Sequence, residues 1–175
     1  MIVVFGAQGI IKDVEAFISQ VLQFSNEERV VLQVMDATMV YSKDHLLSAT
    51  LHATRACEQG TNATGRLGLE IMLYAAGERQ IDKAIKKMGV KNGKQRIAVV
   101  LTDMLRQNMK GNRGERVRKK FLTTFHFKAD DSVLHGDMRT LKRFGISEKE
   151  LSTVPESQYG DLILEKVAFV DVMKK

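Results

Sequence analysis

At 175 residues the chain is long enough for one domain with a buried core, and a composition of 44% hydrophobic and 27% charged residues is typical of a globular protein. This composition excludes a disordered chain, and a single cysteine, Cys57, excludes an internal disulfide or a zinc site built on a cysteine pair. No apolar run approaches the ~20 residues that a membrane-spanning helix needs, and the first residues show no secretory signal. We therefore expect a single domain, residues 1–175, in the cytoplasm.

The first part of the chain alternates between strand and helix patterns. A strand at residues 2–7 leads through Gly9 into a stretch with apolar residues at helical spacing, from Ile11 to Leu22. The turn at residues 6–9 lies where a phosphate-binding loop would sit, but it lacks the third glycine and the lysine, so a tight turn is favoured over nucleotide binding. A second strand is expected at residues 29–35.

The remaining elements complete an α+β pattern. Ser42 offers a helix N-cap, and Gly60 and Gly77 each end a helix. We predict helices at residues 43–59, 66–76, 81–88, 131–144 and 158–173, a buried strand at 96–102, and a basic helix or extended segment at 113–127. The expected fold is a compact two-layer α+β domain with several helices packed on a small mixed or antiparallel sheet.

Positive charge is concentrated in one segment. Residues 91–128 hold 11 basic and 2 acidic side chains, a local excess of +9, although the whole chain carries only +6. Such asymmetry indicates a polyanionic partner, and a solvated lysine-rich face explains it as well. Both interpretations stay open at this point.

The basic segment also carries aromatic residues. Its candidate RNA-binding cations are Lys110, Arg113, Arg116, Arg118, Lys119 and Lys120. Phe121, Phe125 and Phe127 follow, and exposed phenylalanines would stack on bases. Burial in the core is the commoner fate of phenylalanine, so the pattern leaves both roles open.

Catalytic chemistry finds little support in the sequence. The four histidines form no pair at metal-binding spacing, and Cys57 falls on the apolar face of its helix. We expect no metal, no cofactor, no small-molecule substrate and no enzymatic activity. The remaining enzymatic hypothesis, a site formed in three dimensions by His45, Glu70 and Cys57, ranks last.

The segment from Gly77 to Gln80 is a polar cluster between two very apolar helices. A helix C-cap explains Gly77, and a favourable interaction of its negative charge with the start of the next helix explains Glu78. Arg79 opposes the positive end of that next helix, and contact with a partner would give this cation a role.

Three stretches resemble the TPRKB family, the kinase-binding subunits of the KEOPS complex. They are Gly68-Leu-Glu-Ile-Met-Leu-Tyr-Ala-Ala-Gly-Glu-Arg-Gln-Ile81, Asp36-Ala37 with Lys43-Asp-His-Leu-Leu-Ser-Ala49, and Leu164-Glu-Lys-Val-Ala-Phe169. The similarity covers residues 2–102 and 130–172, whereas residues 103–128 are longer and more basic than the family pattern. Whether residues 103–128 are ordered in the protein alone stays open.

The resemblance implies a non-catalytic subunit that binds the amino-terminal lobe of a small atypical kinase. The complex makes threonylcarbamoyladenosine (t6A) in tRNA, and archaeal family members also bind the 3′ CCA end of tRNA. Residues carried over as the kinase-binding region are Leu69, Met72, Gly77, Glu78, Arg79, Gln80 and Ile81. The expected partners are therefore the kinase and tRNA, and the alternative is a stand-alone RNA-binding module without a kinase.

Overall fold

The computed structural model of the chain describes residues 1–103 and 111–174, and within them the chain forms a four-stranded antiparallel sheet. Its strands are β1 (Ile2–Ile11), β2 (Val31–Asp36), β3 (Gly93–Thr102) and β4 (Lys128–Ala129), in the order β2-β3-β1-β4. The two central strands pair along their whole length, from Ile2 opposite Thr102 to Ile11 opposite Gly93. The sheet is therefore built around a pair that is distant in sequence.

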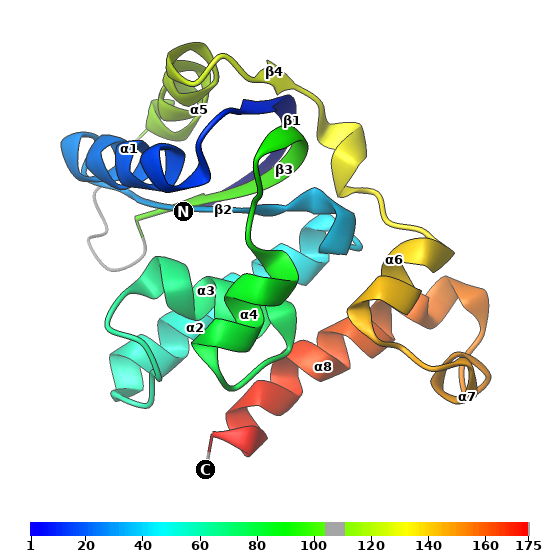
Figure 1. Cartoon of the computed structure of the whole chain (residues 1–175). Helices are drawn as coiled ribbons and strands as arrows, with labels where there is room; N and C mark the ends of the chain where they lie inside the picture. The colour runs from blue at the N-terminus through cyan, green and yellow to red at the C-terminus, as the bar shows by residue number, and fades with distance from the viewer. Residues whose placement is uncertain (104–110, 175) are drawn as a thin grey trace.

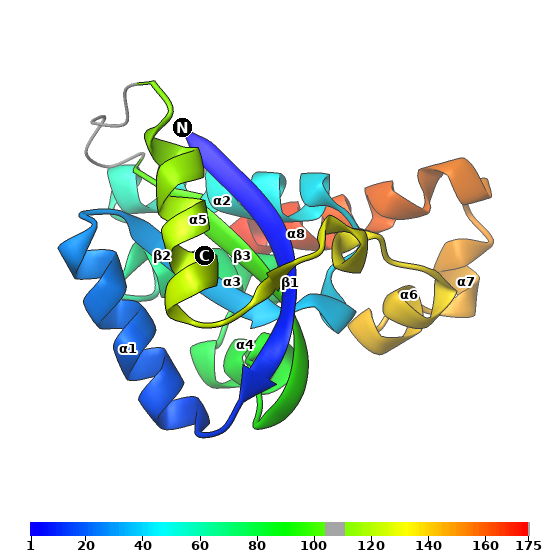
Figure 2. The ribbon, with the colours of Figure 1, turned by 90° about the horizontal axis from the view of Figure 1, so that it is seen from above.

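Helices cover both faces of this sheet (Figures 1 and 2). On one face lie α1 (Val14–Glu27) and α5 (Arg113–Thr124), and on the other lie α2 (Lys43–Gln59), α3 (Leu67–Ala76), α4 (Ile81–Met88) and α8 (Tyr159–Met173). The shorter elements are η1 (Ala37–Met39), η2 (Asp131–Leu134), α6 (Met138–Phe144), α7 (Glu148–Leu151) and η3 (Glu156–Gln158). The α+β class is confirmed, with one layer more than the two-layer packing expected from the sequence.

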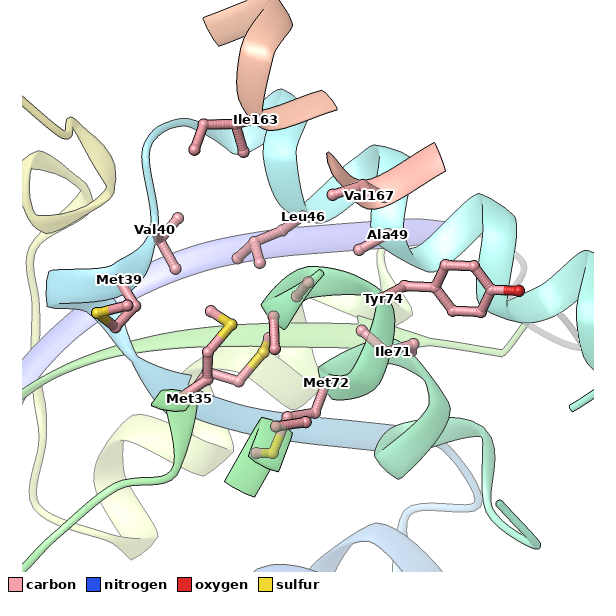
Figure 3. Close-up of a cluster of buried hydrophobic side chains, with 14 of the residues drawn as sticks. Met35, Met39, Val40, Leu46, Ala49, Ile71, Met72, Tyr74, Ile163 and Val167 are labelled. Atoms are coloured by element: carbon pink, nitrogen blue, oxygen red, sulfur yellow. The ribbon is translucent and has the colours of Figure 1, made fainter. Parts of the chain in front are cut away.

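The composition of strand β3 explains why helices cover both faces of the sheet. Its run Ile97-Ala-Val-Val-Leu101 is apolar at every position because the strand is buried on both faces. Ile97, Val99 and Leu101 contact the core under α1 and α5, whereas Ala98 and Val100 contact the core under α2, α3 and α8. Figure 3 shows this second core, where side chains of α2, α3 and α8 meet those of β2 and η1.

Capping residues place the helix ends where the sequence predicts them. The Ser42 hydroxyl accepts from the His45 amide at 3.2 Å, and Gly60 and Gly77 adopt left-handed backbone conformations with φ of 68° and 65°. The predicted helix bounds 43–59 and 81–88 are confirmed, and α3 begins one residue later than predicted.

The glycines of residues 6–9 have a role other than a turn. Both lie inside β1, and a Cβ on Gly6 would come within 2.4 Å of the Asp130 carbonyl oxygen. A Cβ on Gly9 would come within 2.6 Å of the Phe127 ring. The glycines admit the segment that crosses β1 after α5, and the predicted strand-to-helix turn at this position is wrong.

The helix predicted over residues 131–144 is interrupted. It is interrupted at Gly136, whose amide donates to the Tyr41 carbonyl at 2.8 Å and where a Cβ would come within 2.7 Å of the Tyr41 Cα. Asp137 then starts α6 with a capping box shared with Thr140. The structure consequently holds η2 and α6 in place of one helix.

Candidate functional site

The residues predicted to bind a kinase divide between the surface and the core. Arg79 and Gln80 are exposed, whereas Leu69, Glu78 and Ile81 are half-buried. Met72 is only 4% exposed and packs in the core between the sheet and helices α2, α3 and α8. It therefore supports the predicted kinase-binding region from inside the protein and presents no surface to a partner. Gly77 is half-buried at the junction of α3 and α4.

The turn from Gly77 to Gln80 is held by the end of α3. The Gly77 amide donates to the Tyr74 carbonyl at 3.0 Å and the Glu78 amide to the Leu73 carbonyl at 3.1 Å, which is the Schellman pattern. The Lys87 ammonium donates to the Ala76 carbonyl at 2.8 Å. These contacts fix the backbone of the turn, and burial lowers the pKa of Lys87.

Arg79 lies one residue before Gln80, the N-cap of α4, and so outside the first helical turn in which it was expected. It is exposed, and it makes no ion pair with any residue that the structure describes. The geometry thus leaves this cation available to a partner.

Apolar side chains are exposed beside this turn. Ile85 is 46% exposed and lies one helical turn after Ile81 on the same side of α4. Helix α8 passes close to the turn, because a Cβ added to Gly77 would lie 3.4 Å from the Lys166 Cβ. Phe169, three residues after Lys166 on α8, is 52% exposed. We call Glu78, Arg79, Gln80, Ile81, Ile85 and Phe169 the docking surface. The sequence pattern missed Ile85 and Phe169 because both are apolar residues of helices that also bury apolar residues, and only tertiary packing decides which of them stay exposed.

Contacts within the protein already hold three of the six predicted RNA-binding cations. Arg113 donates to the Glu28 carbonyl at 2.6 Å, Lys120 pairs with the Glu28 carboxylate, and Arg118 pairs with Glu115 at 3.0 Å. Arg116 and Lys119 are exposed and make no ion pair within the described part of the chain. Lys110 lies outside the described residues. The available positive charge on α5 is therefore smaller than the sequence suggests.

The phenylalanines of the basic segment belong to the core between the sheet and helices α1 and α5. The Phe121 ring lies 5.8 Å from that of Phe5 and 6.0 Å from that of Phe24, both edge to face. Phe125 lies 5.4 Å from Phe17, and Phe127 is buried. Of the two roles left open by the sequence, the structure supports packing, which fastens α5 to α1 and the sheet.

The three residues of the enzymatic hypothesis do not converge. His45 and Cys57 lie near opposite ends of α2, about 18 Å apart along the helix axis. Burial raises the pKa of the Cys57 thiol, which disfavours the nucleophilic thiolate. Glu70 already accepts hydrogen bonds from the Ala63 amide, the Thr64 amide and the Thr64 hydroxyl at 3.2, 2.9 and 2.8 Å.

His45 is a structural side chain. Its Nε2 lies 2.7 Å from the Ala75 carbonyl oxygen, and its Nδ1 accepts from the Tyr41 amide at 3.3 Å, so the neutral ring carries its proton on Nε2. Complete burial lowers the pKa of His45 from 6.5 to about 4.

We expect this histidine to make the protein acid-sensitive. Between pH 6.5 and 4 the unfolded chain binds a proton at His45 that the folded protein does not, so stability falls as the pH falls. The expected loss between pH 7 and pH 4 is about 3 kcal/mol, measured by denaturant unfolding. The His45→Gln variant should lose the part of the pH dependence that His45 causes and retain the part that the carboxylates cause. If the free energy of unfolding of the two proteins depended on pH in the same way, the prediction for His45 would be wrong.

A polar network joins α8 to α2 and α3. Glu70 pairs with Lys174, the Lys174 ammonium lies 3.3 Å from the Tyr74 hydroxyl, and Tyr74 donates to Asp171. The second Asp171 oxygen lies 2.7 Å from Nδ1 of His52. The pKa of Tyr74 is raised, first by burial and then by the hydrogen bond to Asp171, which keeps the hydroxyl protonated.

An α+β domain with a fixed, exposed turn and apolar side chains around it presents a surface of the kind that binding proteins use. Within the described residues, no helix is both long and apolar enough to cross a membrane. The model of the kinase-binding protein CGI-121 family matches residues 11–129, which is more than half of the chain and includes residues 103–128. The chain belongs to this family, and the resemblance to TPRKB proteins is confirmed.

A curated relative supports the same assignment. The chain is 27% identical over 145 residues to the "Regulatory protein Cgi121" of Methanocaldococcus jannaschii, covering 82% of this chain and 85% of the relative. The similarity thus extends beyond the residues matched by the family model.

Proposed function

We propose that the protein is a non-catalytic accessory subunit of a cytoplasmic KEOPS complex. In this role it binds and regulates the small atypical kinase and helps to bind the 3′ CCA end of tRNA during formation of threonylcarbamoyladenosine. Membership of a family of kinase-binding proteins is the observation that carries the proposal.

The docking surface supports the kinase-binding part. Ile85 and Phe169 present large apolar side chains to solvent beside an exposed arginine, and apolar and arginine side chains are frequent anchors in protein interfaces. The backbone of the turn is fixed by the Schellman motif, so little conformational entropy is lost when a partner binds it.

Replacing Ile85 with aspartate should weaken kinase binding at least tenfold without unfolding the protein, because the charge would be buried in the interface yet is tolerated on the free surface. Ile85 is the better test than Ile81, which packs partly against the core. The measurement is co-elution with the small kinase of the same organism in size-exclusion chromatography, followed by titration calorimetry.

Leu51→Asp is the matched control, since Leu51 is 48% exposed on α2, a helix that contributes no residue to the docking surface. A normal complex with the control and a lost complex with Ile85→Asp would assign the interface to the docking surface. The reverse result would place the kinase on α2 and leave the kinase-binding function intact. No complex with the unaltered, folded protein would refute the kinase-binding function of this chain.

The tRNA-binding part rests on the family resemblance and on exposed cations. Arg116 and Lys119 point from α5 to solvent, in the segment with the local charge excess. A stand-alone RNA-binding module would retain RNA affinity but form no complex with the kinase, so the same co-elution experiment separates the two hypotheses.

A further inference from the structure

A second basic surface lies at the other end of the sheet, in a cleft of about 210 Å³ between η1, the ends of the central strands and α6. Arg96 enters it from β3, and Arg139 and Arg143 enter it from α6, one helical turn apart. His135 and the backbone of Gly136 complete the wall between them. Arg96 belongs to the basic segment at residues 91–128, but none of these residues is among the RNA-binding cations predicted from the sequence.

The sheet extends this cleft with further cations. Arg96 and Lys128 both lie directly opposite Gln8, on either side of β1, so their side chains share one face of the sheet. Lys94 follows two positions from Arg96 on the same face. Two strand spacings separate Arg96 from Lys128, about 10 Å.

The acidic groups at this surface are already engaged. Asp137 accepts from the Arg139 amide at 2.8 Å and the Thr140 amide at 3.2 Å, and Asp130 accepts from the Ser132 amide at 3.0 Å and from Gln8. Hydrogen bonds lower the pKa of both carboxylates, that of Asp130 first through the Ser132 hydroxyl and that of Asp137 first through the Thr140 amide. Arg139 lies 3.8 Å from Asp137, whereas Lys94, Arg96, Lys128 and Arg143 make no ion pair within the described residues. Asp131, beside Asp130, pairs with Lys43 at 2.9 Å. Six cations against three carboxylates leave the surface positive.

The dimensions favour part of a polymer over a whole small molecule. Small-molecule sites enclose ~300–1,000 Å³, more than this cleft contains. A row of cations about 10 Å long exceeds what one phosphate group contacts. Exposed guanidinium groups suit phosphate oxygens because they donate two parallel hydrogen bonds.

We propose that this cleft binds the phosphate backbone of single-stranded RNA, with Arg96, Arg139 and Arg143 around one phosphate and Lys94 and Lys128 serving its neighbours. This inference rests on the RNA-binding part of the proposed function, and it moves the principal contact from α5 to the α6 end of the sheet. Helix α5 covers one face of the sheet (Figures 1 and 2), whereas Arg96 and Lys128 lie on the other face, so variants separate the two surfaces.

The test compares two double variants of the full chain with equal change in charge. Arg96→Glu/Arg143→Glu alters the cleft, and Arg116→Glu/Lys119→Glu alters α5; all four side chains are exposed. Affinity for a single-stranded RNA oligonucleotide is measured by fluorescence anisotropy over a range of salt concentrations. The cleft variant should bind at least tenfold more weakly and its salt slope should fall by about 1.4, whereas the α5 variant should change by less than threefold.

Loss of affinity confined to the α5 variant would overturn this inference and leave RNA binding assigned to α5. If the unaltered protein bound no RNA at low salt, both this inference and the tRNA-binding part of the proposed function would be overturned. The kinase-binding part is decided independently, by co-elution with the kinase. Adenosine monophosphate and inorganic phosphate are tested as competitors of the bound oligonucleotide at equal ionic strength. If either competes as strongly as unlabelled oligonucleotide, the cleft binds free phosphates and the RNA assignment is overturned. If the glutamate variant is unfolded by circular dichroism, Arg96→Gln/Arg143→Gln replaces it, with the same expected direction.

Discussion

Replacing Glu70 with alanine is expected to lower the free energy of unfolding by about 3–5 kcal/mol, because it breaks a buried ion pair on one side only. Glu70 is fully buried, and the side chain of its partner Lys174 is 10% exposed. The substitution leaves the ammonium without its carboxylate and removes the acceptor for the Ala63 and Thr64 amides. Denaturant unfolding monitored by circular dichroism measures the loss.

A double-substitution cycle controls for this effect. Lys174→Met removes the cation and keeps an unbranched side chain, so the Glu70→Ala/Lys174→Met protein should be more stable than the sum of the Glu70→Ala and Lys174→Met losses predicts. A loss below ~1 kcal/mol in Glu70→Ala would show that the ion pair does not fasten the end of α8.

Replacing Phe121 with alanine should also cost about 3–5 kcal/mol of stability, through the lost ring and the cavity left behind. Phe121 is fully buried and contacts the rings of Phe5, Phe24 and Phe125. Thr123→Ala, at an exposed position of the same helix, should change stability by less than ~0.5 kcal/mol. A stable Phe121→Ala protein with weakened RNA binding would instead indicate base stacking by this residue.

Helices with local capping signals were the most predictable elements. The ends of α2 follow from Ser42 and Gly60, two residues that act within one turn of themselves. The end of β1 was mispredicted because Gly9 serves a distant contact with Phe127, which no local pattern reveals. β4 and α7 are too short to leave a periodic signal, so both were missed.

The same distinction applies to the binding surfaces. The turn at residues 77–80 was found because its residues are consecutive. The cleft was not found, because Arg96 and Arg143 come from segments separated by about a quarter of the chain and meet only through the sheet and η2. Charge counting drew attention to α5, yet Glu28 engages two of its cations from a helix far away in sequence.

The pairing of β1 with β3 also bears on how the chain folds during synthesis. Ile11 pairs with Gly93 and Ile2 with Thr102, so β1 leaves the ribosome long before its partner exists. At ~5–20 residues per second this delay is roughly 4 to 20 s. During that interval the backbone N–H and C=O groups of β1, an apolar segment, lack a partner strand. The nascent chain is therefore prone to aggregation, and chaperones have a period in which to act.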